Sequence, residues 1–340
     1  MRTRPSNGTN REGWMLRSLL SRFGIGSAKE PSARPAQKPP RVVSPPPEEG
    51  PSAEGASVTV SPDAVRFLQG LISTPSSSDL QELPPDDRLF LSEIMKRLQE
   101  NSLEVPVLPN TAIEVSRLLA DPMSNLGDFV KAIESDPALS VSVLRTANSA
   151  FYGLSVPTTS LRDDVFRIGL SQLRTIVILS HLQGKVLQSG LFEHEVHWLS
   201  DLSLALAHLG QTLAPELGLE RSVAFTRGTL WHLEHFLIMG TLVEVARQRL
   251  VNTHPSEQCL HEAFFRFGRK IRELAARIWD LEDLLTPETE EDEATLRYEH
   301  LQRALIAAWT GTDPPQEVDW VSTQKLAEAL VKVEHSGNTG

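Results

Sequence analysis

A succession of helix-period apolar patterns is the feature that most constrains the fold of this chain of 340 residues. From residue 86 onward, apolar residues recur at spacings of three and four, which places them on one face of an α-helix. No alternating pattern of useful length predicts a β-strand. The chain is therefore expected to be all-α. Two of the clearest helical series are Leu126, Phe129, Val130, Ile133 and Leu199, Leu202, Leu206, Leu209, Leu213.

Several of the expected helices are long. Residues 170–187 are apolar nearly all round, which predicts a central buried helix. Residues 194–217 form one amphipathic pattern that ends at Gly218. Residues 220–251 are expected to be helical with a break at Gly228 or Gly240. Further helices are expected at 86–101, 111–120, 126–133, 257–280, 294–309 and 320–334.

Composition changes near residue 60 and divides the chain. Residues 1–60 are rich in Pro, Ser and Gly and are expected to form a disordered tail, because they cannot bury enough apolar surface. Nine Lys or Arg and two Glu give residues 1–42 a charge of +7, and the net charge of −11 leaves −18 for the remainder. An acidic body repels nucleic acid, so no specific nucleic-acid partner is expected. Residues 61–104 are expected to form a helical extension, and 311–340 a last helix and tail.

Residues 14–25 form a short amphipathic segment inside the basic tail. One interpretation is a transient helix; the other is a helix that docks on an acidic partner or touches a membrane surface weakly. Arg17 and Arg22 interrupt the apolar centre that a secretory signal would need. The chain has no apolar run long enough for a transmembrane helix, and its one cysteine, Cys259, fits a reducing compartment. A cytoplasmic location is therefore expected.

The stretch from 136 to 153, DPALSVSVLRTANSAFYG, is the most distinctive local pattern. Asp136 is expected to cap a helix whose first turn holds Pro137, and Arg145 lies opposite the apolar face. The end of the stretch crowds polar and aromatic side chains beside a turn glycine, which suits either a structural role in closing the helix or the rim of an interaction surface. These side chains are Asn148, Ser149, Phe151 and Tyr152.

Three segments together resemble the HDOD domain, the "HD-related output domain" of bacterial signalling proteins. They are VPVLPNTAIEVSRLLADP (105–122), AIESDPALSVSVLRTANSAFYG (132–153) and TSLRDDVFRIGLSQLRTIVI (159–178). The resemblance covers roughly residues 88–310. It implies a two-lobed helical domain at 105–310, with an N-terminal helical lobe at about 105–189. The second lobe, about 190–310, is implied to resemble degenerate HD metal-dependent phosphohydrolases.

HD phosphohydrolases bind metal through a His, a His-Asp pair and a further Asp. In the family frame, the first His falls on Ser200 and the His-Asp pair falls on Trp231 and His232. If the alignment is shifted by one residue, the pair falls on His232 and Leu233, which still provides no carboxylate. In the first alignment, Trp231 cannot ligate a metal. The resemblance therefore implies that catalysis has been lost, and no catalytic residue, cofactor or metal is expected.

Two histidine pairs leave a weaker alternative open. His194 and His197 are three residues apart, as are His232 and His235, and the resemblance would place their helices side by side. One interpretation is that the two pairs form a substitute metal site. The other is that they are helix-surface or capping histidines.

Three functional hypotheses follow. The first is a non-enzymatic regulatory protein that binds a protein partner in a signalling pathway, such as motility, stress response or biofilm control, which the resemblance implies. The second is a metal-dependent HD-type phosphohydrolase. The third is a binding module that senses a cyclic dinucleotide or another nucleotide without turnover.

Overall fold

The computed structural model describes residues 61–73, 80–148, 160–249, 254–285, 293–312, 321–322 and 325–330. The expected disordered tail, with its segment 14–25, lies outside these ranges. So do Ser149, Phe151 and Tyr152. Residues 60–340 form one unit of the chain, and its described part is the subject below.

Helices, and no strands, make up the regular structure of the described ranges, so the all-α prediction is confirmed. Residues 325–330 are also helical, within the last helix that the sequence predicts. In chain order the elements are α2 (Pro62–Ile72), the 3-10 turn η1 (Leu80–Glu82), α3 (Pro85–Gln99), α4 (Asn110–Ala120), α5 (Leu126–Glu134), α6 (Pro137–Ala147), α7 (Leu161–Ile168), α8 (Leu170–Leu187), α9 (Glu193–Thr212), α10 (Ala214–Leu217), α11 (Arg221–Thr229), α12 (Leu233–Arg249), α13 (Glu257–Ile278), α14 (Glu282–Leu285) and α15 (Glu293–Thr310).

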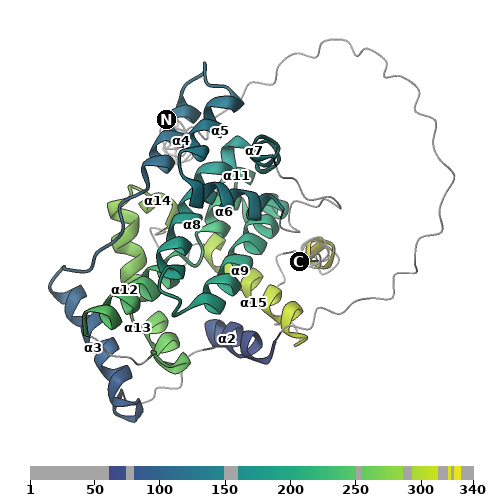
Figure 1. Cartoon of the computed structure of the whole chain (residues 1–340). Coiled ribbons are helices and arrows are strands. Elements are labelled where there is room, and N and C mark those ends of the chain that lie inside the picture. Colours follow the sequence, from purple (N-terminus) through teal and green to yellow (C-terminus); the bar gives the residue numbers. More distant parts are fainter. Residues whose placement is uncertain are drawn as a thin grey trace, which may run out of the picture. The chain divides into compact units, whose positions relative to one another are not determined.

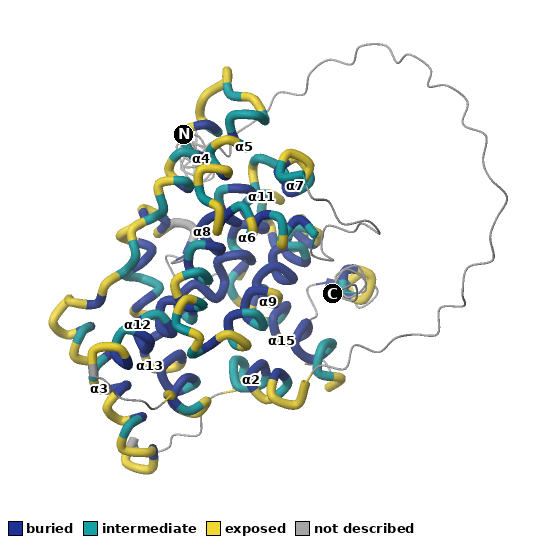
Figure 2. The backbone as a smooth tube through the Cα atoms, viewed as in Figure 1, coloured by how far each residue is buried: buried dark blue, intermediate teal, exposed yellow. Residues whose placement is uncertain are grey.

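Helix α8 lies at the centre of this arrangement (Figure 1). It packs against α4, α6 and α7 from the first lobe and against α9, α11 and α12 from the second. Because neighbours surround it, α8 buries residues on every side, as its nearly uniform apolar character predicts. The burial pattern agrees, since buried residues concentrate in α8, α9, α11 and α12, and exposed residues are frequent in the outer elements α3 and α5 (Figure 2).

Two expected helices are interrupted. The 194–217 pattern divides at Leu213 into α9 and α10, and the short α10 then ends at Gly218, whose φ of 67° suits a left-handed cap. The break expected at Gly228 or Gly240 lies instead at residues 230–232. Both glycines stay helical, because glycine lowers helix stability without ending a helix by itself.

Gly228 has a packing role in α11. A Cβ atom at this position would lie 2.6 Å from the Cα atom of Ala207 in α9. The absence of a side chain therefore allows the backbones of α9 and α11 to approach closely. This contact brings the end of α11, and the turn that follows it, against α9.

The extension before residue 105 packs on the second lobe. Helix α3 contacts α12 and α13, and buried Asp87 of α3 accepts hydrogen bonds from the Ser256 backbone N–H (3.1 Å) and hydroxyl (2.5 Å). The Cys259 thiol lies one turn into α13 and donates to the Asp87 carbonyl at 3.7 Å. Burial raises the pKa of this thiol, so Cys259 stays protonated and belongs to the core.

Gly228→Ala should lower the free energy of unfolding by about 1 to 3 kcal/mol, because the added methyl group forces two backbones apart. Urea denaturation followed by circular dichroism measures the change. Gly184→Ala in α8 is the matched control: nothing lies within 4 Å of the added Cβ, so stability should stay equal or rise by up to about 1 kcal/mol. Equal effects of the two substitutions would contradict the close approach.

Candidate functional site

The turn between α11 and α12 holds Trp231 and His232, the two residues expected from the sequence at the positions of the His-Asp pair. Trp231 is 7% exposed and His232 is fully buried. Leu230, Trp231 and His232 form this turn because α11 ends at Thr229 and α12 begins at Leu233. Both polar side chains have therefore left water and need partners inside the protein.

Gln302 of α15 supplies those partners. The Trp231 indole Nε1 donates to Gln302 Oε1 at 2.8 Å, and since an indole only donates, this contact fixes the orientation of the amide. The amide nitrogen of Gln302 then donates to His232 Nε2 at 3.1 Å. Burial lowers the pKa of His232 well below its usual value, so the ring is neutral. Its proton therefore lies on Nδ1, which donates to the Ser203 hydroxyl at 3.0 Å.

An ion pair lies beside this network. Arg272 of α13 donates to both carboxylate oxygens of Glu234, at 2.9 and 2.6 Å, and to the Trp231 carbonyl at 2.7 Å. Its guanidinium also lies 5.3 Å from the centre of the Trp231 ring. Burial alone raises the pKa of Glu234, but Arg272 and His235 outweigh it and hold that pKa far below its usual value. Glu234 is thus an ionised, paired carboxylate.

Aromatic rings complete the enclosure of the turn. Tyr298 of α15 stacks on Trp231 with ring centres 5.2 Å apart, and its hydroxyl donates to the Ala224 carbonyl in α11. The His235 ring packs on Phe264 at 4.3 Å. We call Ser203, Trp231, His232, Glu234, Arg272 and Gln302 the turn network. It joins α9, α12, α13 and α15 around one point.

The turn network does not fit a metal ion. A metal would need the lone pair of His232 Nε2, which accepts from Gln302 instead. Ser200, at the position of the first His, donates its hydroxyl to the Val196 carbonyl within its own helix. Across the residues that the structure describes, no three His, Cys, Asp or Glu side chains gather as they would around a metal ion. No chemistry through a bound metal follows from this arrangement.

The two histidine pairs lie in different surroundings. The His232 and His235 rings are 5.2 Å apart beside the turn network. His194 stacks on Trp198 at 5.8 Å, and His197 contacts Arg145 of α6, with 3.4 Å between Nε2 and Nη1. Ser203 is the α9 residue that touches His232, and His197 lies six residues earlier, about 9 Å along the helix axis. Helix α9 therefore lies beside the turn after α11, as expected. The imidazoles of His194 and His197 lie at another level along α9 than His232.

The α6 motif has structural contacts at both ends. Asp136 accepts from the backbone N–H groups of residues 138 and 139 at 3.0 and 3.1 Å, and Pro137 occupies the first turn. Asn148 follows the last helical residue, and Arg167 of α7 donates to the Ala147 carbonyl at 2.9 Å and to Asn148 Oδ1 at 3.4 Å. These contacts suit the structural interpretation of Asp136, Pro137 and Asn148. The interaction role of the motif stays a prediction.

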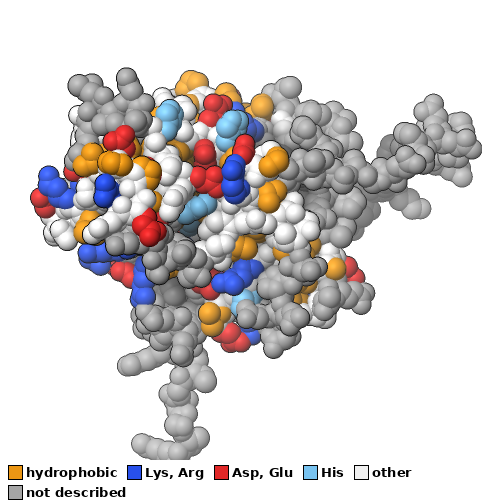
Figure 3. Space-filling model, turned by 90° about the horizontal axis from the view of Figure 1, so that it is seen from below, with side chains coloured by type: hydrophobic (Ala, Val, Ile, Leu, Met, Phe, Trp, Pro, Cys, Tyr) orange, Lys and Arg blue, Asp and Glu red, His pale blue; other side chains and the backbone are white. Residues whose placement is uncertain are grey.

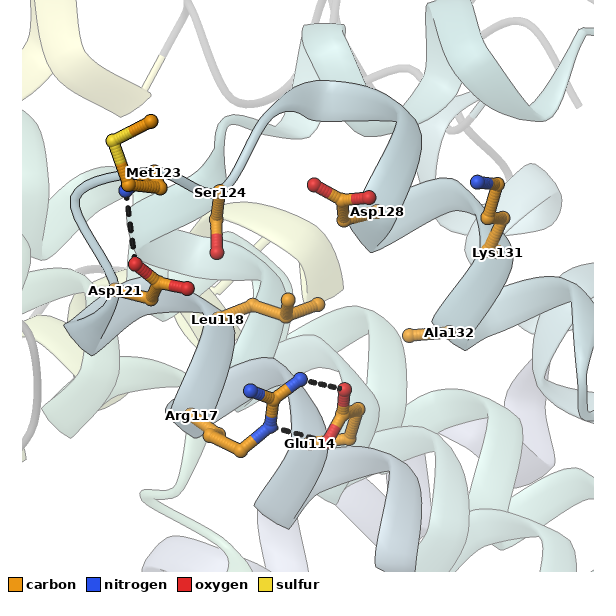
Figure 4. A pocket seen from close by; sticks show the side chains of 9 residues that line it. All are labelled: Glu114, Arg117, Leu118, Asp121, Met123, Ser124, Asp128, Lys131 and Ala132. Carbon is orange, nitrogen blue, oxygen red and sulfur yellow. Dashed lines mark hydrogen bonds and ion pairs between the residues drawn. The ribbon is translucent and has the colours of Figure 1, made fainter.

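A surface hollow of about 370 Å³ lies between α4 and α5 (Figure 4). Its polar groups serve the local structure: Arg117 binds Glu114 at 2.6 and 2.9 Å, and Asp121 accepts from the Met123 backbone N–H at 2.9 Å. Asp128 accepts from the Asn125 backbone N–H at 3.0 Å, which caps α5. The charges are mixed and do not converge on one point, so the hollow indicates no ligand class. It is lined by Glu114, Arg117, Leu118, Asp121, Met123, Ser124, Asp128, Lys131 and Ala132.

Comparison with known proteins agrees with this fold. The model of the HDOD domain matches residues 105–294. The chain belongs to the HDOD family. A protein of Treponema pallidum (strain Nichols), described as "Uncharacterized protein", is 33% identical over 95 residues, which are 28% of this chain and 18% of that protein. The HDOD chain thus matches less than a fifth of that relative's length.

Two solved structures are similar to this chain, and their descriptions differ. A crystal structure from Shewanella amazonensis SB2B, "Putative metal-dependent phosphohydrolase", has a TM-score of 0.50 at 16% identity and covers 75% of this chain and 100% of its own. One from Marinobacter aquaeolei VT8, "Putative signal transduction protein", has a TM-score of 0.38 at 18% identity and covers 76% of this chain and 67% of its own. At such identities the first likeness concerns the fold alone. Within the described ranges, no helix of the HDOD chain has the length and apolar character needed to cross a membrane.

The sequence drew attention to two members of the turn network, Trp231 and His232, through the family resemblance, but it did not indicate their partners. Arg272 and Gln302 are 41 and 70 residues away from the atoms they bind, and no local pattern distinguishes them from other polar residues of α13 and α15. The one available signal was indirect: Glu234 lies in a largely apolar helix, and a buried carboxylate there needs a cation nearby.

Gln302→Leu should lower the free energy of unfolding by about 2 to 4 kcal/mol, because it leaves the Trp231 N–H and His232 Nε2 buried without partners, at roughly 1 to 3 kcal/mol each. Gln248→Leu is the matched control. Gln248 makes its hydrogen bonds to Arg97 and Glu244 at the exposed surface, so its loss should change stability by less than about 0.5 kcal/mol. Chemical denaturation of both variants checks the difference.

Arg272→Met should destabilise the protein by about 3 kcal/mol at pH 7, because it leaves a buried carboxylate uncompensated. In the wild type, the depressed pKa of Glu234 contributes stability that is complete above the unfolded value of about 4.3 and is lost as pH falls. In the variant, burial raises this pKa, so acid relieves the penalty. The stability difference should therefore narrow below about pH 4.

Arg269→Met controls for the loss of one positive charge from α13. Arg269 pairs with Glu273 at an exposed site, where the two side chains are 72% and 43% exposed. Its removal should change stability by less than about 0.5 kcal/mol at any pH. Denaturation curves measured from pH 3 to 8 test both variants, and a constant difference between them would contradict the paired state of Glu234.

Proposed function

We propose that this HDOD chain is a non-enzymatic regulatory protein that acts by binding another protein. One observation supports the proposal: Trp231 and His232, which the resemblance aligns with the His-Asp pair, lie in a hydrogen-bonded turn network in which the His232 Nε2 lone pair accepts from Gln302. A hydrolytic metal would have to break this network before it could bind. The same contacts make the second lobe rigid, which suits a platform for a partner.

A signalling role for the platform follows from the family rather than from a catalytic group. The HDOD resemblance implies bacterial signal output, and motility, stress response and biofilm control are the processes it suggests. The partner would be a protein, since residues 43–340 carry the negative charge that disfavours nucleic acid. A supplementary contact through residues 14–25 with an acidic partner or a membrane surface belongs to this proposal.

Metal analysis and a turnover assay test the non-enzymatic part. We expect well under one equivalent of Mn, Fe, Ni or Zn per purified chain, and no hydrolysis of bis-p-nitrophenyl phosphate or a cyclic dinucleotide above the blank. The His232→Ala and His235→Ala variants should match the wild type in both measurements. Stoichiometric metal together with turnover that either substitution abolishes would replace the proposal by the phosphohydrolase hypothesis.

Protein binding needs a positive test as well. The tagged full chain should retain a defined protein from its native host, and the two should form a complex again when purified separately and mixed, as size-exclusion chromatography would show. A thermal-shift screen with cyclic dinucleotides and guanosine tetraphosphate serves as the contrast. A shift of several degrees with one nucleotide, without any protein complex, would favour the sensing module instead.

A further inference from the structure

Helix α2 covers a face of the HDOD domain from outside it. It spans Pro62–Ile72, whereas the family match begins at residue 105. It packs on α9, α13 and α15 of the second lobe (Figure 1). A helix from the extension therefore occupies a groove formed mainly by family helices.

The contact has one apolar anchor. Phe67 is 1% exposed and lies 5.6 Å from the Trp198 ring and 5.7 Å from the His261 ring, measured between ring centres. Ala64 and Leu68 are buried beside it. Trp198 in turn stacks on His194. The groove thus packs the Trp198 indole and the His261 imidazole against the phenyl ring of Phe67.

Gly70 decides how closely the helix can lie. A Cβ atom at this position would meet His261 Cε1 at 2.0 Å, so only glycine lets the imidazole rest against the α2 backbone. Gly70 follows Phe67 by three residues and shares its face. An occupant of this groove therefore needs a large aromatic residue and a glycine three positions later.

Charges on the rim are complementary and exposed. Arg66 pairs with Glu257 of α13, with 3.6 Å between Nε and Oε2, and also with Asp63 within α2. The Arg66 and Glu257 side chains are 66% and 38% exposed, so the pair orients the helix more than it stabilises it. Figure 3 shows the molecule from below, and this face carries acidic, basic and histidine side chains among hydrophobic ones.

We propose that the groove between α9, α13 and α15 is a docking site for an amphipathic helix with the pattern Arg-Phe-x-x-Gly, and that α2 is its resident occupant. A partner protein that carries such a helix displaces α2 and binds in its place. The recognition is helix-in-groove, with Phe as the anchor, Gly for close approach to His261 and Arg for Glu257. This inference rests on the proposed function and specifies its surface.

The resident helix competes with any partner because it is tethered. A tethered segment acts at an effective concentration in the millimolar range, so a free helix of equal affinity binds poorly until α2 is released. The Ser61 hydroxyl accepts from the Ala64 N–H at 3.2 Å and caps α2. This cap lies within α2, so it does not depend on the contact with the groove. A substitution that weakens the packing of α2 on α9, α13 and α15 should therefore make the groove accessible to a free helix.

Gly70→Ala in the full chain should release α2, with Gly184→Ala as the matched control. The probe is a fluorescein-labelled peptide of residues 61–73, which keeps glycine at position 70. We expect fluorescence anisotropy to show at least tenfold tighter peptide binding to the Gly70→Ala chain than to the wild type or the control. A peptide with Phe67→Ala should lose at least tenfold in affinity for the Gly70→Ala chain.

Hydrogen exchange of residues 61–73 reports whether α2 has been released, and Phe67→Ala in the chain is the second releasing variant. Global unfolding of both variants, unchanged exchange in both, or release without peptide binding would each overturn the inference, since α2 would then be an ordinary core helix or the groove would have no affinity of its own. None of these outcomes depends on metal content, turnover or a native partner. A negative result for the α2 groove would therefore leave the proposed function untouched, and the reverse also holds.

Discussion

The ion pair between Arg272 and Glu234 is the interaction on which the second lobe depends. It lies where α11 ends and α12 begins, and a helix end leaves backbone groups that need partners. Arg272 supplies one of these partners by binding the Trp231 carbonyl while it neutralises Glu234. The arginine therefore satisfies the turn and the carboxylate together. Gln302 and Ser203 then satisfy the side chains of Trp231 and His232.

The turn network satisfies the buried polar groups at this point of the fold without a metal ion. A site that has lost ligands must still satisfy the polar groups that stay buried. Here a neutral imidazole, an amide and an arginine form a closed set of hydrogen bonds at the position of the His-Asp pair. The centre of this part of the fold therefore supports packing, which agrees with the proposed binding function.

The prediction from sequence was most successful where the evidence was local. Amphipathic spacing located the helices, and Asp136 with Pro137 marked the start of α6 to the residue. The resemblance drew attention to Trp231 and His232, which the structure places in the turn network, while their match to the His-Asp positions stays a prediction. The break near Gly228 was misplaced, because a glycine that permits close packing with Ala207 looks the same in sequence as one that ends a helix. The described residues hold no group of three or more His, Cys, Asp or Glu side chains placed as metal ligands, which agrees with the structural interpretation of the two histidine pairs.

The sequence by itself determined the helical class, the order of the helices and the family, because periodicity, caps and ordered motifs are properties of neighbouring residues. Only the tertiary structure decided that Arg272 and Gln302 meet at one turn and that α2 inserts Phe67 between Trp198 and His261. Contacts of this kind join residues from about 40 to almost 200 positions apart. Their energy depends on distance and burial in the packed chain, and neither is encoded in any single segment.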